Sequence, residues 1–142
     1  MRERFWRTSS RTTLARIATP PLSGLGLVGE PVPSRPAAIE EALASRRIPV
    51  VAPIAVGPLN VNADEAAGAL AVGLGADRIV FVSDVPGVFV DGAWAGRIEA
   101  ARADSLIAAG AFDGGIVPKL LAAVRAARVG VRAEIGATEV LG

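Results

Sequence analysis

Residues 59–64 (LNVNAD) place the amides of Asn60 and Asn62 close to the carboxylate of Asp64. In extended backbone, side chains two positions apart point to the same side, so both amides would face one ligand. Paired amides suit a carboxylate or an amide on a substrate. An Ala-rich helix is expected to follow, and the helix dipole favours Asp64 at its start. Two interpretations stay open here: a ligand site, or a helix start that Asp64 merely caps.

Residues 82–87 (VSDVPG) follow the apolar run 78–82 (RIVFV), which predicts a buried strand. Ligands of open α/β sheets bind outside the carboxyl ends of the strands. Ser83 and Asp84 occupy that place, where they could bond a ribose, a base or a phosphate. The alternative is a simple tight turn, which Pro86 and Gly87 favour.

Residues 113–119 (DGGIVPK) open a predicted helix with two glycines, a proline and Lys119. Free N–H groups in a first helical turn, with no side chains in the way, suit a phosphate. The Lys119 ammonium adds a point charge that could stabilise a transferring phosphoryl group. The spacing is not that of a Walker A loop. The alternative is that Lys119 is an ordinary solvated surface lysine.

Residues 24–29 (GLGLVG) match the G-x-G-x-x-G pattern of dinucleotide-binding folds. That pattern works only between a strand and a helix, whose N-terminus then faces the pyrophosphate. Here Pro20 and Pro21 precede the glycines, and Pro31 and Pro33 follow them. We therefore interpret the segment as a glycine-rich strand or turn, with a strand over 25–29.

The composition excludes several kinds of site. The chain has 142 residues, which suits one domain, and neither cysteine nor histidine, so disulfides and thiolate metal sites are absent. Acid–base chemistry must then come from Asp, Glu, Lys or the backbone. The formal net charge of +1 gives no reason to expect nucleic acid as a partner. Apolar stretches are short and interrupted, so no membrane span is predicted.

The first residues form a separate segment, 1–21, which we expect to be a disordered or vestigial lead-in. It is rich in arginine, with five of them in the first sixteen positions: Arg2, Arg4, Arg7, Arg11 and Arg16. This composition superficially resembles an organelle transit peptide but lacks the apolar centre of a secretory signal. A cytoplasmic location is the default expectation.

Strand and helix patterns alternate along the rest of the chain. Helices are expected from a Ser34 N-cap to residue 46, over 63–74 with Gly75 ending it, over 101–109 and over 117–128. Strands buried on both faces are expected at 48–54 (IPVVAPI) and 78–82, adjacent in the sheet, with a third at 131–135. A hairpin is expected over 85–94, with its turn at Asp91-Gly92. The alternation predicts an α/β fold, a three-layer αβα sandwich with a mainly parallel sheet.

The three motifs, taken in this order, resemble those of acetylglutamate kinases in the amino acid kinase family. The likeness covers residues 22–132 and includes the apolar run 48–54, then LNVNAD, SDVPG and GGIVPK. It implies an amino acid kinase-like fold and transfer of the γ-phosphoryl group of ATP to the side-chain carboxylate of N-acetyl-L-glutamate, in arginine biosynthesis. ATP with Mg²⁺ is then a substrate, and no tightly bound cofactor or resident metal is expected.

The resemblance also implies roles for individual residues. Asn60 and Asn62 would bind the amino-acid substrate, Asp64 would orient the catalytic lysines, and Lys119 would stabilise the transition state. The nucleotide would be held by two loops and their flanks: Ser83, Asp84, Val85, Pro86, Gly87, Val88 and Phe89, with Ala111, Phe112, Asp113, Gly114 and Gly115. The segment Gly136-Ala137-Thr138 resembles a Gly-Thr turn of the family.

Residues 22–142 correspond in this comparison to a truncated domain, the C-terminal, ATP-binding half. The family's Lys-x-Gly-Gly loop and acetylglutamate loop have no counterpart here. We therefore expect no turnover by this chain alone, and either a homo-oligomer or a need for an N-terminal half. Two alternatives remain: a nucleotide-binding fragment or partner subunit without catalysis, and the lysine-pathway homologue that acts on aminoadipate.

Overall fold

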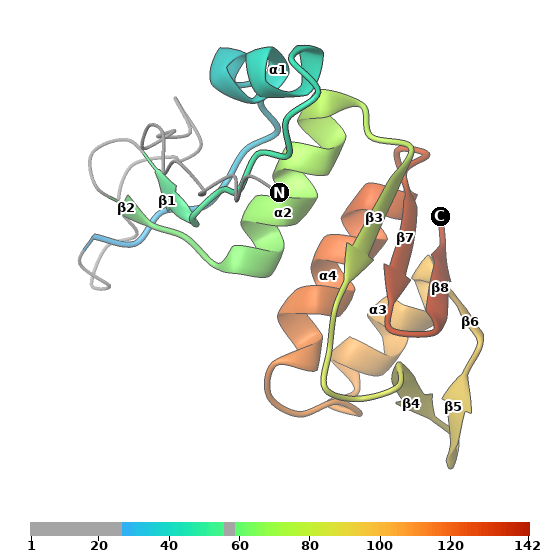
Figure 1. The fold of residues 1–142 in the computed structure, drawn as a ribbon. Helices are drawn as coiled ribbons and strands as arrows, with labels where there is room; N and C mark the ends of the chain where they lie inside the picture. Colours follow the sequence, from blue (N-terminus) through green and yellow to red (C-terminus); the bar gives the residue numbers. More distant parts are fainter. Residues whose placement is uncertain (1–26, 56–58) are drawn as a thin grey trace, which may run out of the picture.

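The computed structural model describes residues 27–55 and 59–142 (Figure 1). The predicted lead-in, residues 1–21, and the first residues of the glycine pattern at 24–29 lie outside the described residues. The helices are α1 (Ala37–Ala44), α2 (Ala63–Leu74), α3 (Ala100–Ala108) and α4 (Ile116–Ala127). The strands are β1 (Ile54–Ala55), β2 (Leu59–Asn60), β3 (Arg78–Phe81), β4 (Val88–Val90), β5 (Ala93–Ala95), β6 (Arg97–Glu99), β7 (Arg132–Ile135) and β8 (Thr138–Leu141).

The principal sheet has four strands in the order β3-β7-β8-β6. The pairs β3–β7 and β6–β8 are parallel, and the tight connection from β7 to β8 makes that pair antiparallel. There are two further small antiparallel pairs: β4–β5, and β1–β2, which lies with α1 on the other side of α2 from the principal sheet (Figure 1). The predicted α/β class with a mainly parallel sheet is confirmed.

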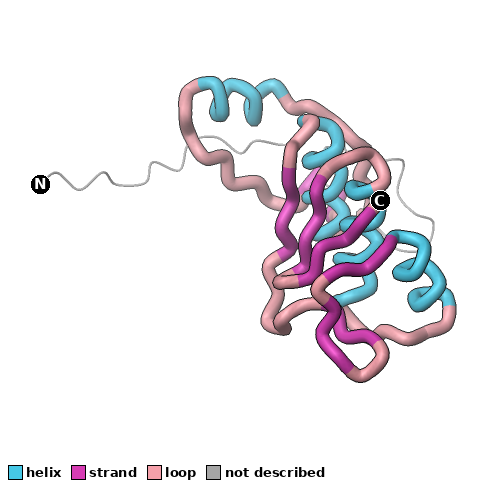
Figure 2. The backbone as a smooth tube through the Cα atoms, turned by 90° about the vertical axis from the view of Figure 1, so that its right-hand side faces the viewer, coloured by secondary structure: helices cyan, strands magenta, loops and turns pink. Residues whose placement is uncertain are grey.

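Helix α4 packs against one face of the sheet, with α2 and α3 on either side of it (Figures 1 and 2). The main core lies between this helical layer and the strands and is rich in alanine. Its fully buried members include Val88, Leu120, Ala123, Val124, Ala133 and Ile135. A second, smaller core joins α1, β1 and β2 to α2 through Ile39, Ala55, Leu59, Val61 and Ala66.

The other face of the sheet carries charged side chains that pair across neighbouring strands. Arg78 of β3 donates to Glu134 of β7, and Arg97 of β6 donates to Glu139 of β8 at 3.0 Å. Glu134 also lies 3.8 Å from Arg132. Ile79 and Phe81 of β3 pack toward the core, whereas Val80, between them, is exposed. The prediction that 78–82 is buried on both faces was therefore wrong, because this strand alternates between a covered and an open face.

Most predicted elements are confirmed to within a residue. Helix α2 spans the predicted range and ends at Gly75, whose φ of 65° is the left-handed conformation that glycine adopts freely. The hairpin β4–β5 turns at Asp91 and Gly92, which both have positive φ, as a tight two-residue turn requires. Helices α3 and α4 begin and end one residue before the predicted positions.

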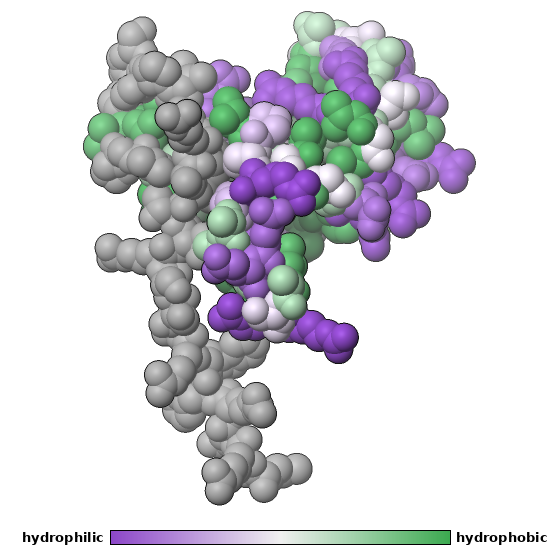
Figure 3. All heavy atoms as spheres, turned by 90° about the horizontal axis from the view of Figure 1, so that it is seen from above, coloured by the Kyte–Doolittle hydropathy of each residue, from purple (hydrophilic) through white to green (hydrophobic). Residues whose placement is uncertain are grey.

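The segment 48–54 is the main error of the sequence interpretation. Only Ile54 is in a strand, the two-residue β1, and Ile48 and Val50 are 90% and 92% exposed. Nor does it lie next to β3, whose partner is β7. Pro49 and Pro53 have no N–H to give to a neighbouring strand, so the apolar composition alone could not make this segment a central strand. On the described part of the face seen in Figure 3, hydrophobic and hydrophilic residues are mixed.

The start of α1 also differs from the prediction. Its N-cap is Pro36, and the expected N-cap, Ser34, has a buried hydroxyl without a partner among the described residues. An exposed ion pair between Arg35 and Glu40 at 2.7 Å links the residue before Pro36 to the first turn. Within residues 27–55 and 59–142, no helix is long and apolar enough to cross a membrane.

Gly73 allows α2 to lie directly against the backbone before α1. A Cβ at Gly73 would lie 2.2 Å from both the N and the O of Ser34. Gly73→Ala should therefore lower the free energy of unfolding by about 1–3 kcal/mol, despite the better helix propensity of alanine. Urea unfolding would measure this. Gly96→Ala is the control, since a Cβ there meets open space; equal stability of the two variants would contradict the packing argument.

Hydrogen bonding to the Arg78 guanidinium lowers the pKa of Glu134 below its usual value. A carboxyl with a lowered pKa in the folded state stabilises the fold at pH values above its unfolded pKa, about 4.3, and loses this effect as the pH falls. The melting temperature of Glu134→Gln should thus fall below that of the wild type at neutral pH and converge with it in acid. Glu40→Gln, in a more exposed pair, is the control. A difference that is independent of pH would contradict this cause.

Candidate functional site

Asn62 begins α2 and makes its first turn rigid. Its side-chain Oδ1 accepts hydrogen bonds from the backbone N–H groups of Asp64 at 3.0 Å and Glu65 at 3.1 Å. These are two of the donors that a helix start leaves without partners. The cap is therefore Asn62, and the side chain of Asp64 is free for another partner. This resolves the first alternative left open by the sequence: Asp64 is not the capping residue.

The start of α4 is built from small residues. Gly114 has a φ of 61°, and a Cβ at either Gly114 or Gly115 would meet nothing within 4 Å. No side chain caps this helix in the described structure, and Pro118 in its first turn has no N–H. The N–H groups ahead of Pro118 therefore open toward space that an anion could occupy.

Gly68 of α2 and Ala122 of α4 bring the two helix starts together. A Cβ on Gly68 would lie 3.3 Å from the Cβ of Ala122, so the helices are in close contact at this point. Asp64 precedes Gly68 by four residues and Lys119 precedes Ala122 by three, which puts each on the same face as its small residue. The two side chains consequently meet across the interface.

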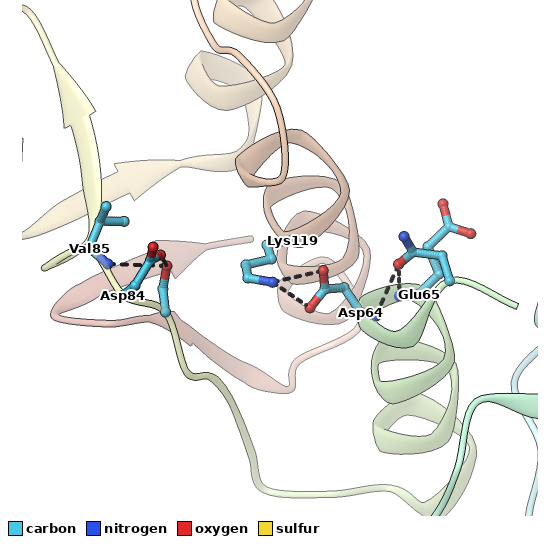
Figure 4. A network of polar contacts seen from close by, with 7 residues as sticks. Asp64, Glu65, Asp84, Val85 and Lys119 are labelled. Carbon is cyan, nitrogen blue, oxygen red and sulfur yellow. Dashed lines mark hydrogen bonds and ion pairs between the residues drawn. The ribbon is translucent and has the colours of Figure 1, made fainter.

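Lys119 and Asp64 form a two-pronged ion pair (Figure 4). The Lys119 Nζ lies 3.0 Å from Oδ1 and 2.9 Å from Oδ2 of Asp64, and the side chains are 23% and 22% exposed. The pair is thus partly shielded from water, which strengthens the attraction and holds the ammonium in one position. Chemically, this is a fixed cation at the junction of two helix N-termini.

The loop 82–87 follows β3 and lies at the same end of the fold as the starts of α2 and α4 (Figure 1). Asp84 is exposed there, and only weak contacts hold the polar groups: Ser83 Oγ donates to Asp84 Oδ1 at 3.4 Å and accepts from Val85 N at 3.5 Å. Figure 4 shows no bond from Asp84 to either Lys119 or Asp64. The carboxylate of Asp84 is therefore available to a ligand.

The remaining predicted nucleotide residues divide into exposed and buried ones. Phe89 is half exposed and stacks edge-on against Trp94, with ring centroids 5.0 Å apart. Gly87 and Val88 are buried, and the N–H of Val88 is already bonded to Thr138. Pro86 lies exposed in the loop, its carbonyl bonded to the N–H of Ala137. In the loop before α4, Phe112 packs on the core while Ala111, Asp113, Gly114 and Gly115 are exposed.

Asn60 lies apart from the ion pair, in β2. Its backbone N–H donates to Leu27 at 2.7 Å and its carbonyl accepts from Gly29 at 2.9 Å, in a parallel bridge with Val28. Its side chain is exposed, without a bond among the described residues. The structure thus brings Asp64, Lys119 and Asn62 together but leaves Asn60 and Asp84 on separate segments around them.

Two features of the site had no predicted role. Gly68 appeared only as one member of an Ala-rich helix, although a glycine inside a helix is itself a signal of close packing. Thr138 is the other: its hydroxyl bonds Val88 and Ala95 of the β4–β5 hairpin. A depression of about 320 Å³ lined by Asp91, Arg97 and Arg102 lies beside α3 and contains none of the predicted site residues. We place the site by its chemistry, at the ion pair.

Comparison with known proteins identifies the family of this chain. The sequence model of the amino acid kinase family matches residues 7–136. The chain belongs to the amino acid kinase family. Among curated relatives, the acetylglutamate kinase of Roseiflexus castenholzii is 50% identical over 116 residues, which are 80% of this chain and 45% of the relative. That of Rubrobacter xylanophilus is 42% identical over 118 residues, or 81% and 47%.

Two solved structures have a fold similar to that of this chain. The structure of smu.665 from Streptococcus mutans UA159 has a TM-score of 0.75 and 31% identity, covering 82% of this chain and 51% of its own. N-acetylglutamate synthase from Neisseria gonorrhoeae, with a TM-score of 0.70 and 23% identity, supports the fold alone; the match covers 96% of this chain and 39% of that one. The chain thus spans about half the length, or less, of these relatives. The resemblance to acetylglutamate kinases in this family is confirmed.

The cap at Asn62 can be tested by substitution. Asn62→Ala leaves the N–H groups of Asp64 and Glu65 without their partner, so the free energy of unfolding should fall by about 1 kcal/mol. Asn62→Asp keeps an acceptor at the cap and should stay close to the wild type. Asn60→Ala, with an exposed side chain, is the matched control. Chemical denaturation would measure all three, and equal loss in Asn60→Ala would argue against the capping role.

Proposed function

We propose that this chain supplies the ATP-binding part of an acetylglutamate kinase. In the reaction, the γ-phosphoryl group of MgATP is transferred to the side-chain carboxylate of N-acetyl-L-glutamate, a step of arginine biosynthesis. The proposal rests on the ion pair between Lys119 and Asp64, together with relatives at 42% and 50% identity that are acetylglutamate kinases. A cytoplasmic location goes with this function.

Lys119 is the proposed electrostatic catalyst. Phosphoryl transfer spreads negative charge over the equatorial oxygens, and catalysis comes from charges fixed in place before the reaction. Asp64 holds the Lys119 ammonium by both carboxylate oxygens, which meets that requirement. Asp64 is thus the proposed positioning residue, and Lys119 the proposed contact to the transferring group.

The nucleotide is proposed to lie between the loop 82–87 and the start of α4. The N–H groups near Gly114 and Gly115 would receive phosphate oxygens, with no Cβ in the way. Asp84, exposed and free of ion pairs among the described residues, would bond the ribose or the Mg²⁺ of the nucleotide complex. Asn60 is proposed to bind the acetylglutamate. Asn62 caps α2 through its Oδ1, and its amide NH₂ group remains a proposed contact to the same substrate.

The first test measures nucleotide binding by these residues alone. Calorimetric titration with MgATP should show saturable binding at millimolar concentration, and Asp84→Ala should weaken it. Absence of saturation with a folded sample would overturn the nucleotide site. We expect no phosphorylation of acetylglutamate by these residues alone, since Lys119 is the only lysine they contain and the reaction needs cations fixed on both sides of the phosphoryl group.

The second test measures transfer. A chimera would join this chain to the portion of the Roseiflexus castenholzii relative that the match leaves uncovered. It should phosphorylate N-acetyl-L-glutamate, and Lys119→Ala should lower kcat by about a hundredfold to a thousandfold. Arg125→Ala, an exposed cation at the far end of the same helix, should leave kcat unchanged. Nucleotide binding without transfer would identify a binding module in place of a kinase.

A further inference from the structure

We propose that Thr138 is the positioning residue for the nucleotide loop 82–87. Its hydroxyl bonds both strands of the β4–β5 hairpin that directly follows the loop, and the β7–β8 turn that precedes Thr138 bonds the two ends of the loop. The inference rests on the proposed function insofar as the loop binds nucleotide; the anchoring itself is a property of the fold. Thr138 lies at the start of β8, more than fifty positions along the chain from Ser83 and Asp84.

The burial of the Thr138 side chain distinguishes it from the other described polar residues. Among residues 27–55 and 59–142, it is the one polar side chain counted as buried, with none of its surface exposed. A hydroxyl in such a place costs free energy unless it is hydrogen-bonded. It accepts from the N–H of Val88 at 2.8 Å and donates to the carbonyl of Ala95 at 2.5 Å. Val88 and Ala95 face each other in the β4–β5 pair, so one hydroxyl joins both strands.

Two glycines make room for this contact. A Cβ on Gly87 would lie 2.4 Å from the Thr138 Oγ1, and a Cβ on Gly136 would lie 2.4 Å from the carbonyl oxygen of Pro86. Gly136 also has a φ of 55°, which other residues adopt only with strain. The backbone at Gly87 therefore lies directly against the Thr138 hydroxyl, and the backbone at Gly136 lies directly against that of Pro86, each at a distance that leaves no room for a Cβ.

The loop is fixed at both of its ends by this turn. At its beginning, the N–H of Gly136 donates to Phe81 at 3.1 Å; near its end, the N–H of Ala137 donates to Pro86 at 2.7 Å. Within the loop, by contrast, the bonds of Ser83 are 3.4 Å and 3.5 Å long. The conformation that presents Asp84 is thus imposed from the β7–β8 turn and not by the loop's own contacts.

The test removes the hydroxyl and keeps the shape. Thr138→Val leaves the buried N–H of Val88 without an acceptor, so MgATP should bind about tenfold more weakly in calorimetry. Thr138→Ser restores the hydroxyl and should bind within about twofold of the wild type. Val140→Ala, a buried residue of the same strand away from the loop, controls for general loss of stability. Equal affinity of Thr138→Val and the wild type, or equal weakening in Val140→Ala, overturns the proposal.

Amide hydrogen exchange provides a readout that needs no nucleotide. Exchange over residues 84–88 should accelerate about tenfold in Thr138→Val and stay at the wild-type rate in Thr138→Ser, while α2 remains unchanged in both. Unchanged protection at Val88 in Thr138→Val overturns the anchoring. If the wild type binds no MgATP, the proposed function fails by itself, and the exchange result alone decides whether Thr138 positions the loop.

Discussion

Helices α2 and α4 approach each other so closely at Gly68 that a Cβ there would lie 3.3 Å from the Cβ of Ala122. The ion pair depends on this contact, because Asp64 and Lys119 lie one turn before those two residues. A larger residue at the crossing would separate the helix starts and lengthen both contacts between the Lys119 ammonium and Asp64. The close packing of two small residues thus determines the geometry of the ion pair between Asp64 and Lys119.

The same principle holds at the other side of the site, where Gly87 and Gly136 allow the β7–β8 turn to touch the loop 82–87. The core between them is built largely of alanines, including Ala123, Ala126 and Ala133, all with no exposed surface. Small side chains bring the backbones close together, and the ion pair between the Asp64 and Lys119 side chains spans the short distance that remains. A site that must hold charges in place gains from such a scaffold, since less rotamer freedom remains to be lost.

The sequence predicted an element well where several local features indicated the same structure. The alanines of α2, with Gly75 after them, determine both the type of the helix and its end. The prediction of a central strand at 48–54 was wrong because an apolar composition indicates burial but does not provide a neighbouring strand. The prolines at 49 and 53 also reduce the number of backbone hydrogen bonds that the segment could make with such a strand. The contact of Asp64 with Lys119 spans 55 positions and was implied only by resemblance to a family. The role of Thr138 depends on a turn that no local pattern connects with the loop above it.

The charges at the helix starts are not equivalent, and this explains why Asp64 and Lys119 belong together. The N-terminus of α2 favours the Asp64 carboxylate through its dipole, whereas the N-terminus of α4 disfavours the Lys119 cation. The Asp64 carboxylate is therefore stabilised both by the dipole of α2 and by Lys119. The Lys119 cation, at a position that the dipole of α4 disfavours, is stabilised by Asp64. An incoming anion would share the same cation with Asp64, so the lysine is held in place beforehand and does not have to be recruited when the anion arrives.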